Sequence, residues 1–103
     1  MTLEIAETIR QQLGRRALFM LGAKEFTGSD AGRYLQFKIG QNSKRVSHIR
    51  ITLDPSDTYT VTAYQYRRQN GFSVPTILET CSDVYVDNLH RVIESLTGLY
   101  TSL

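Results

Sequence analysis

Two histidines and one cysteine are the side chains of this 103-residue sequence that most often bind metals or act in catalysis. His48 and His90 fall on different predicted elements, and no cysteine or carboxylate near them completes the ligand spacing of a zinc site. The segment from Gly28 to Gly32 is rich in small residues, but it lacks the Lys-Ser/Thr ending of a phosphate-binding loop. We therefore expect no metal and no cofactor.

Two further arrangements could support catalysis. His90 lies one helical turn from both Asp87 and Glu94, and such a set could exchange protons as an acid and a base. Cys81 could be a nucleophile at a helix N-terminus, where the helix dipole lowers the pKa of a thiol. However, exposed ion pairs are common on any helix, and free cysteine is usually a buried apolar residue, here filling the corner between a strand and a helix. We interpret the chain as non-enzymatic, with no catalytic residue.

The lysines and arginines are distributed unevenly. Of the twelve, seven fall within residues 31–78, where Asp54 and Asp57 are the only acids. That region therefore carries a charge of +5 and the rest of the chain −3, so the net charge of +2 conceals a strongly dipolar molecule.

The elements that must position these residues begin with a helix. Within residues 2–13, Ile5, Ile9 and Leu13 recur at four-residue spacing and Thr2 is a suitable N-cap, which predicts an amphipathic helix. Residues 17–21 form an apolar run too short for periodicity to separate a strand from a helix, and we predict a strand there.

A change of pattern then predicts a sheet. The small, polar residues 27–32 predict a mobile loop. Residues 34–39 and 48–53 alternate apolar and polar side chains, as half-buried strands do. Residues 58–67 consist mainly of the β-branched and aromatic residues that suit a pleated surface.

Turn residues indicate that these strands are antiparallel neighbours. The segment Asp54–Asp57 has Asp and Pro at the first two positions of a type I turn, and Asn70-Gly71 is a strong hairpin signal. Residues 72–78 predict an edge strand, since Pro75 cannot donate to a ladder.

The C-terminal part predicts a second amphipathic helix. Ser82 or Asp83 would be its cap and Gly98 its end. Its apolar stripe steps by four and three residues and consists of Tyr85, Leu89, Val92, Leu96 and Leu99.

Together these elements predict an α+β fold. We expect a four- to five-stranded antiparallel meander sheet with an N-terminal and a C-terminal helix packed on one face, in a single domain over residues 1–103. No apolar run is long enough to span a bilayer, and Glu4 and Glu7 stand where a signal peptide would be basic, so we expect a cytoplasmic protein without membrane contact. The single cysteine agrees with a reducing compartment.

The meander predicts where the charges lie. Alternate hairpin loops share one end of such a sheet, so the loop holding Lys44 and Arg45 should neighbour the loop holding Arg67 and Arg68. The acids of the Asp54–Asp57 turn should lie at the opposite end. Side chains on the face away from the helices include Tyr34, Lys38, His48, Arg50, Tyr64 and Tyr66.

Four segments resemble a group of short, mostly uncharacterised proteins encoded in bacteriophages and integrated mobile elements. The segments are Leu21–Lys24, Val46–Leu53 with Asp57-Thr58-Tyr59, Val84–Leu89 (VYVDNL) and Thr97–Leu103 (TGLYTSL). The resemblance transfers no activity and no site residue. It implies a small accessory protein working inside a bacterial host cell.

Tyrosines interleaved with cations on an open sheet suit the stacking of unpaired bases and the neutralisation of phosphates. We therefore expect a binding module whose partner is a nucleic acid, possibly single-stranded, or a nucleic-acid-handling host protein. Exposed Tyr and Arg are also typical of protein interfaces, so a homodimer, another homo-oligomer or an inhibitor of a host defence protein is the alternative. The candidate binding residues are Tyr34, Lys38, Lys44, Arg45, His48, Arg50, Tyr64, Tyr66, Arg67 and Arg68.

Overall fold

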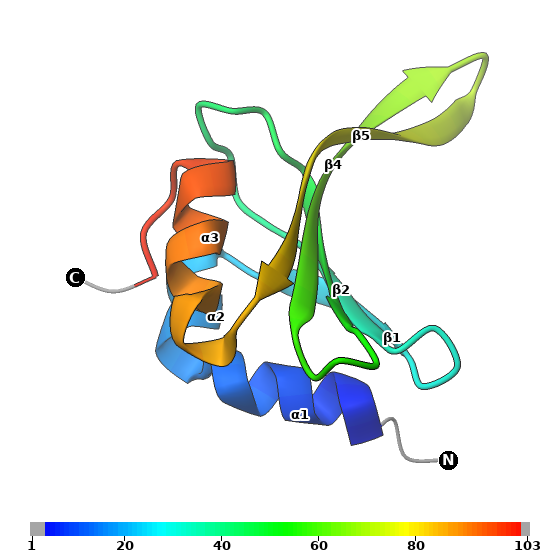
Figure 1. Ribbon diagram of the computed structural model, residues 1–103. Coiled ribbons are helices and arrows are strands. Elements are labelled where there is room, and N and C mark those ends of the chain that lie inside the picture. Colours follow the sequence, from blue (N-terminus) through cyan, green and yellow to red (C-terminus); the bar gives the residue numbers. More distant parts are fainter. Residues whose placement is uncertain (1–3, 102–103) are drawn as a thin grey trace.

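The computed structural model describes residues 4–101 and shows the predicted α+β architecture (Figure 1). Five strands form one antiparallel sheet in the order β1-β2-β3-β4-β5, which is a meander. The elements are α1 (Glu4–Leu13), α2 (Arg15–Leu21), β1 (Lys24–Ser29), β2 (Tyr34–Lys38), β3 (His48–Leu53), β4 (Tyr59–Gln69), β5 (Phe72–Val84), the 3₁₀ turn η1 (Val86–Asn88) and α3 (Leu89–Thr97).

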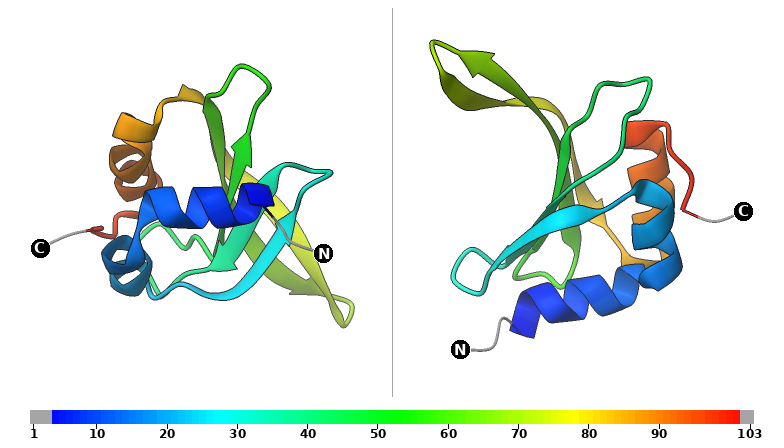
Figure 2. Two further views of the ribbon diagram at one scale, coloured as in Figure 1. Left: turned by 90° about the horizontal axis from the view of Figure 1, so that it is seen from below. Right: turned by 180° about the vertical axis from the view of Figure 1, so that it is seen from behind.

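The hydrophobic core lies between the helices and one face of the sheet, and the two views of Figure 2 show the helices gathered on that side. Helix α1 packs on β1, β2 and β3, whereas α3 packs on β4 and β5. The predicted inward residues of the central strands are buried except Leu53, which is only partly buried, and Phe37, Ile49, Ile51 and Val61 are fully enclosed. The period-two alternation therefore identified the core face correctly.

The predicted strand at residues 17–21 is wrong, because this run belongs to helix α2. Gly14 adopts φ 85° and ψ 157°, a conformation open almost only to glycine, and this separates α2 from α1. Gly22 ends α2 in the left-handed conformation. Ala17, Leu18 and Leu21 are buried while Phe19 is exposed, which is a helical pattern too short to recognise in five apolar residues.

The predicted loop at residues 27–32 is only partly correct. Residues up to Ser29 belong to β1, which pairs with β2 through Thr27 opposite Gln36 and Ser29 opposite Tyr34. The turn is confined to residues 30–33. This strand carried no alternating signal because it lies at the edge of the sheet, where most of its side chains are exposed.

The two predicted turns are confirmed. The amide of Asp57 donates to the carbonyl of Asp54 over 2.9 Å, closing the turn between β3 and β4. Asn70 and Gly71 both have positive φ, 51° and 83°, as a tight hairpin between β4 and β5 requires.

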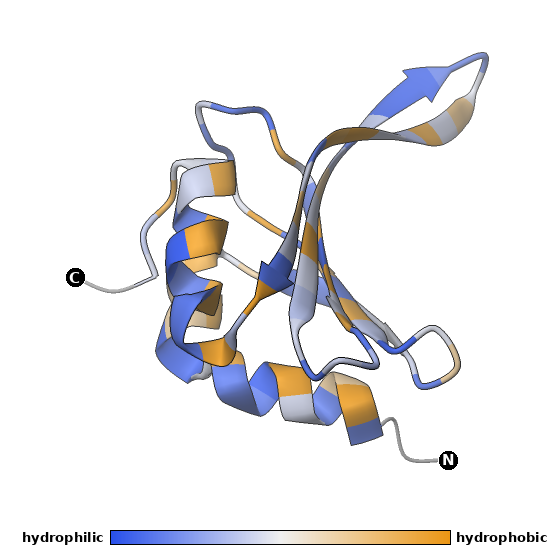
Figure 3. Cartoon of the chain, in the orientation of Figure 1, coloured by the Kyte–Doolittle hydropathy of each residue, from blue (hydrophilic) through white to orange (hydrophobic). Residues whose placement is uncertain are grey.

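Strand β5 is an edge strand, as predicted, but it continues to Val84 instead of ending at residue 78. Together with the end of β4 it forms a two-stranded projection, residues 67–80, in which every residue is exposed; we call this the β4–β5 arm. Figure 1 shows the arm rising away from the helices, and Figure 3 shows apolar residues mainly on its β5 side.

The C-terminal helix begins later than predicted. Ser82 and Asp83 still belong to β5, and the chain enters α3 through η1 without a side-chain cap. Tyr85 therefore precedes the helix and is exposed, and the buried helical positions are Leu89, Ile93, Leu96 and Thr97. Val92 is only partly buried, so the predicted apolar stripe was wrong at its centre, where the structure buries Ile93 in place of Val92.

The end of the helix is confirmed, because Gly98 is left-handed and its amide donates to the carbonyl of Glu94. Among the described residues, none of the helices has the length and apolar character needed to cross a bilayer.

Candidate nucleic-acid interface

The candidate site is the sheet face turned away from the helices, which we call the open face. Strand register places its side chains in cross-strand rows: Lys38, His48 and Tyr64 form one row, and Gln36, Arg50 and Thr62 the next. Tyr34 and Tyr66 extend the face at its two ends. Apart from Thr62, which is buried, these side chains are half-buried, because they pack on one another.

Arg50 is the centre of this packing. Its guanidinium carbon lies 4.0 Å from the ring centroid of Tyr34 and 5.6 Å from that of Tyr64. The two tyrosines are on the strands on either side of Arg50, so the guanidinium contacts an aromatic ring on each side. Such stacking fixes the plane of the guanidinium and so orients its N–H donors.

Gln36 links the centre to the rest of the face. The Arg50 Nε donates to Gln36 Oε1 over 2.9 Å, and Gln36 Nε2 donates to the hydroxyl of Tyr66 over 3.2 Å. Within residues 4–101, the two terminal amino groups of Arg50 have no hydrogen-bond acceptor, so they remain free for an anion. Gln36 was not among the predicted site residues, although its alternation with Tyr34 and Lys38 along one strand already placed it on this face.

His48 forms a second aromatic contact. Its ring centroid lies 4.2 Å from that of Tyr66, and its Nδ1 lies 3.0 Å from the Ser47 hydroxyl. Burial lowers the pKa of His48, and the positive charge of Lys38 lowers it further, while Glu25 acts in the opposite direction. His48 is therefore neutral at pH 7.

The two arginines of the β4–β5 arm lie on opposite faces. Successive residues of a strand point to opposite sides, so Arg68 shares the open face with Tyr64 and Tyr66. Arg67 lies on the other side, where its Nε donates to Gln65 Oε1 over 2.9 Å. Of these two predicted binding residues, only Arg68 thus extends the open face.

The loop between β2 and β3 holds the other predicted cations. It lies at the same end of the sheet as the arm, opposite the Asp54–Asp57 turn, but Figure 1 shows the loop and the arm diverging. Lys44 Nζ donates to the carbonyl of Ser95 in α3 over 2.8 Å, so this side chain turns toward the helix. Arg45 is exposed in the same loop, with a left-handed φ of 57°.

The side chains considered for catalysis have other partners. His90 Nε2 lies 2.7 Å from the carbonyl of Leu13 and connects α3 to α1. Glu94 accepts hydrogen bonds from the amide and the hydroxyl of Thr101, and these bonds lower its pKa. Cys81 lies within β5 and packs against the core, so the expected strand-to-helix corner falls further along the chain.

Among residues 4–101, no group of three or more His, Cys, Asp or Glu side chains could hold a metal ion. Comparisons of the chain with protein-family models, with curated proteins and with solved structures find no match.

Proposed function

We propose that this chain is a non-enzymatic accessory binding protein of the phage or mobile-element type that binds single-stranded nucleic acid on its open face. The observation that carries the proposal is the position of Arg50 between Tyr34 and Tyr64, with its terminal amino groups free. A guanidinium held in this way can donate two parallel hydrogen bonds to a phosphate without first losing side-chain freedom.

The neighbouring side chains extend this site in both directions. Lys38 lies in the next row of the open face, and Arg68 lies beyond Tyr66 on the arm, so cations are distributed along the face. Each tyrosine ring stacks on Arg50 or His48 with part of its surface, and the remaining part can receive a base. A surface of this composition binds single strands with little dependence on sequence.

A protein partner is the second candidate, and the β4–β5 arm is the observation that favours it. A two-stranded hairpin without further packing is only marginally stable in water. The side chains of Phe72 and Ile77 on this arm are 73% and 60% exposed. A second copy of the chain, or a host protein, would cover them.

The open face can be tested with a pair of matched arginine variants. Binding of fluorescently labelled oligo(dT) and oligo(U) is measured at several salt concentrations for the wild type, Arg68→Gln and Arg67→Gln. Both variants lose one charge from an exposed side chain of the arm. We expect Arg68→Gln to flatten the slope of log affinity against log salt by about 0.7, because one phosphate contact is lost, and Arg67→Gln to change it little. Tyr64→Ala should weaken binding by about 1–3 kcal/mol through the lost stack.

Two outcomes would contradict the proposal. If Arg68→Gln and Arg67→Gln decrease the salt slope equally, binding of the nucleic acid depends on the overall charge of the protein and not on the open face. Absence of binding tighter than about 100 μM at low salt would exclude nucleic acid, because basic surfaces bind strands non-specifically at that level. Light scattering of the free chain then tests whether the arm joins two copies.

The lowered pKa of His48 predicts a pH dependence of the same binding. The free protein holds His48 neutral at pH 7, and a nearby phosphate stabilises its protonated form, so the pKa is higher in the complex. Affinity should therefore rise as the pH falls from 7 to 5. His48→Gln should remove most of this rise, whereas His90→Gln, on the helical side, should keep it. An unchanged pH profile for His48→Gln would place the strand away from this histidine.

A further inference from the structure

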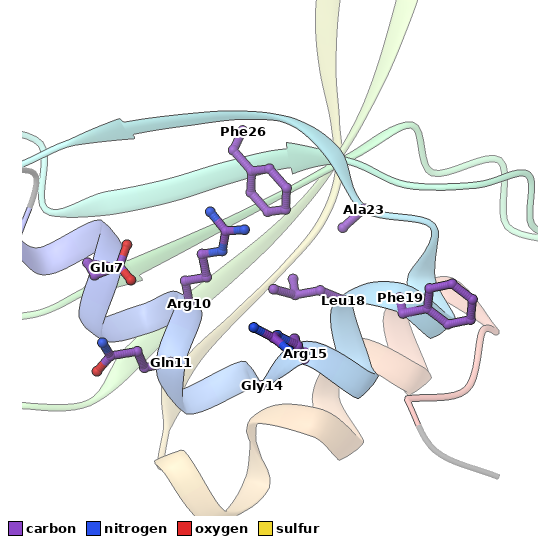
Figure 4. A pocket seen from close by; sticks show the side chains of 9 residues that line it. All are labelled: Glu7, Arg10, Gln11, Gly14, Arg15, Leu18, Phe19, Ala23 and Phe26. Carbon is purple, nitrogen blue, oxygen red and sulfur yellow. The ribbon is translucent and has the colours of Figure 1, made fainter.

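A groove on the helical side of the molecule has features that the open face does not use. Helix α1, helix α2 and strand β1 enclose a space of about 740 Å³, open to solvent (Figure 4). Pockets of this volume are of the size that accepts small organic ligands. Phe26, in its wall, packs at 5.6 Å on Phe37 of the core, so the groove lies on the side of the sheet opposite to the open face.

Two arginines face this groove from different helices. The guanidinium of Arg10 lies 4.7 Å from the ring centroid of Phe26. This stacking holds the guanidinium beside Phe26 in the wall of the groove. Arg15 stands across the groove at the beginning of α2, as Figure 4 shows. Within residues 4–101, neither guanidinium has an ion-pair partner or a side-chain hydrogen bond, so their donors remain available to a ligand.

The charges in the groove favour a single negative charge on the ligand. Glu7 also lines the groove, so two cations and one acid leave an excess of one positive charge. A carboxylate matches the fork of a guanidinium with two parallel hydrogen bonds. A dianion would meet the carboxylate of Glu7 without a further cation to balance it.

Apart from Gln11 and Gly14, the rest of the wall is apolar. Leu18 lies between Phe26 and Arg15 in Figure 4 and shows only 8% of its surface, whereas Phe26 keeps 37% exposed. Phe19, at the outer margin, is 84% exposed although it is a large apolar side chain. A flat hydrophobic ligand gains free energy by removing such surface from water.

We propose that this groove binds a small aromatic monocarboxylate, with the carboxylate at Arg15 and Arg10 and the ring against the apolar wall of Leu18 and Phe26. The ligand class follows from the excess of one positive charge and from the exposed apolar surface of Phe26 and Phe19 beside the arginines. The site is independent of nucleic-acid binding, because it lies on the opposite side of the sheet.

Titration of the isotope-labelled full chain, followed by amide chemical shifts, tests this site with benzoate as the probe. Acetate lacks the ring, benzyl alcohol lacks the charge, and phenyl phosphate carries nearly two charges. We expect benzoate to shift the amides of Gly14, Leu18 and Ala23 with a dissociation constant of about 1–10 mM, as its size allows. The other three probes should bind at least about fivefold more weakly.

A matched pair of variants locates the carboxylate. Arg15→Gln should weaken benzoate binding about tenfold, whereas Arg16→Gln, on the neighbouring exposed position outside the groove, should leave it unchanged. Both residues are exposed, so both variants should fold, and their amide spectra report this directly. The proposal is overturned if benzoate causes no shifts up to about 50 mM, roughly five times the upper end of the expected range. It is also overturned if any other probe binds equally well or if Arg16→Gln has the same effect as Arg15→Gln.

Discussion

Replacing Phe37 by alanine should lower the free energy of unfolding by about 3–5 kcal/mol, because a large buried ring is lost and the cavity collapses only in part. Phe37 is fully buried on β2, beneath α1 and beside Phe26. Chemical denaturation of the wild type and Phe37→Ala measures the difference.

Phe72→Ala is the matched control, since it removes the same ring from the arm. Phe72 is 73% exposed, so its loss should change the free energy of unfolding by no more than about 0.5 kcal/mol. A cost above about 2 kcal/mol for Phe72→Ala would show that the arm is packed in solution, for instance against a second copy. A cost below about 1 kcal/mol for Phe37→Ala would contradict the position of the core.

Replacing Ile93 by alanine should cost about 2–5 kcal/mol, and Val92→Ala no more than about 1 kcal/mol. Ile93 is completely buried against the sheet, whereas Val92 lies at the margin of the core. The two residues are neighbours on α3 and both are β-branched, so helix propensity changes in the same direction in both variants. Denaturant melts of the two variants therefore mainly compare burial, since the extra methylene of isoleucine contributes only about 0.8 kcal/mol.

This pair also decides between the two descriptions of the last helix. The sequence pattern predicts Leu89 and Val92 as the inward positions, and the structure buries Leu89 and Ile93. A larger cost for Val92→Ala than for Ile93→Ala would restore the sequence-based stripe. Leu89→Ala should cost about 2–5 kcal/mol under either description, because Leu89 belongs to both.

Period-two alternation and two strong turn signals were sufficient to predict the central sheet. The turns define which strands are neighbours, and alternation defines which side chains face the core. The sequence alone therefore assigns Tyr34, Arg50 and Tyr64 to one face of the sheet. Strand β1 could not be predicted in this way, since an exposed edge strand needs no apolar alternation.

The secondary structure of short apolar runs could not be predicted either, because such runs are too short to show a period. Five consecutive apolar residues are compatible with a buried strand and with a single helical stripe. Residues 17–21 became a helix because Gly14 and Gly22 begin and end it and because the core receives Leu18 and Leu21 from the helical side. Helix α3 begins later than the sequence predicted, because β5 continues to pair with β4 as far as Val84, beyond the expected cap at Ser82 or Asp83.

The sequence by itself determined the antiparallel meander, its core face and the strand or loop on which the cations Lys38, Arg50 and Lys44 lie, because these follow from local alternation and turn chemistry. Only the tertiary structure decided which contacts the side chains of those cations make. The stacking of Arg50 between two tyrosines depends on side-chain packing across three strands. The turn of Lys44 toward Ser95 depends on where a distant helix ends, and contacts between such distant segments have no local signature in the chain.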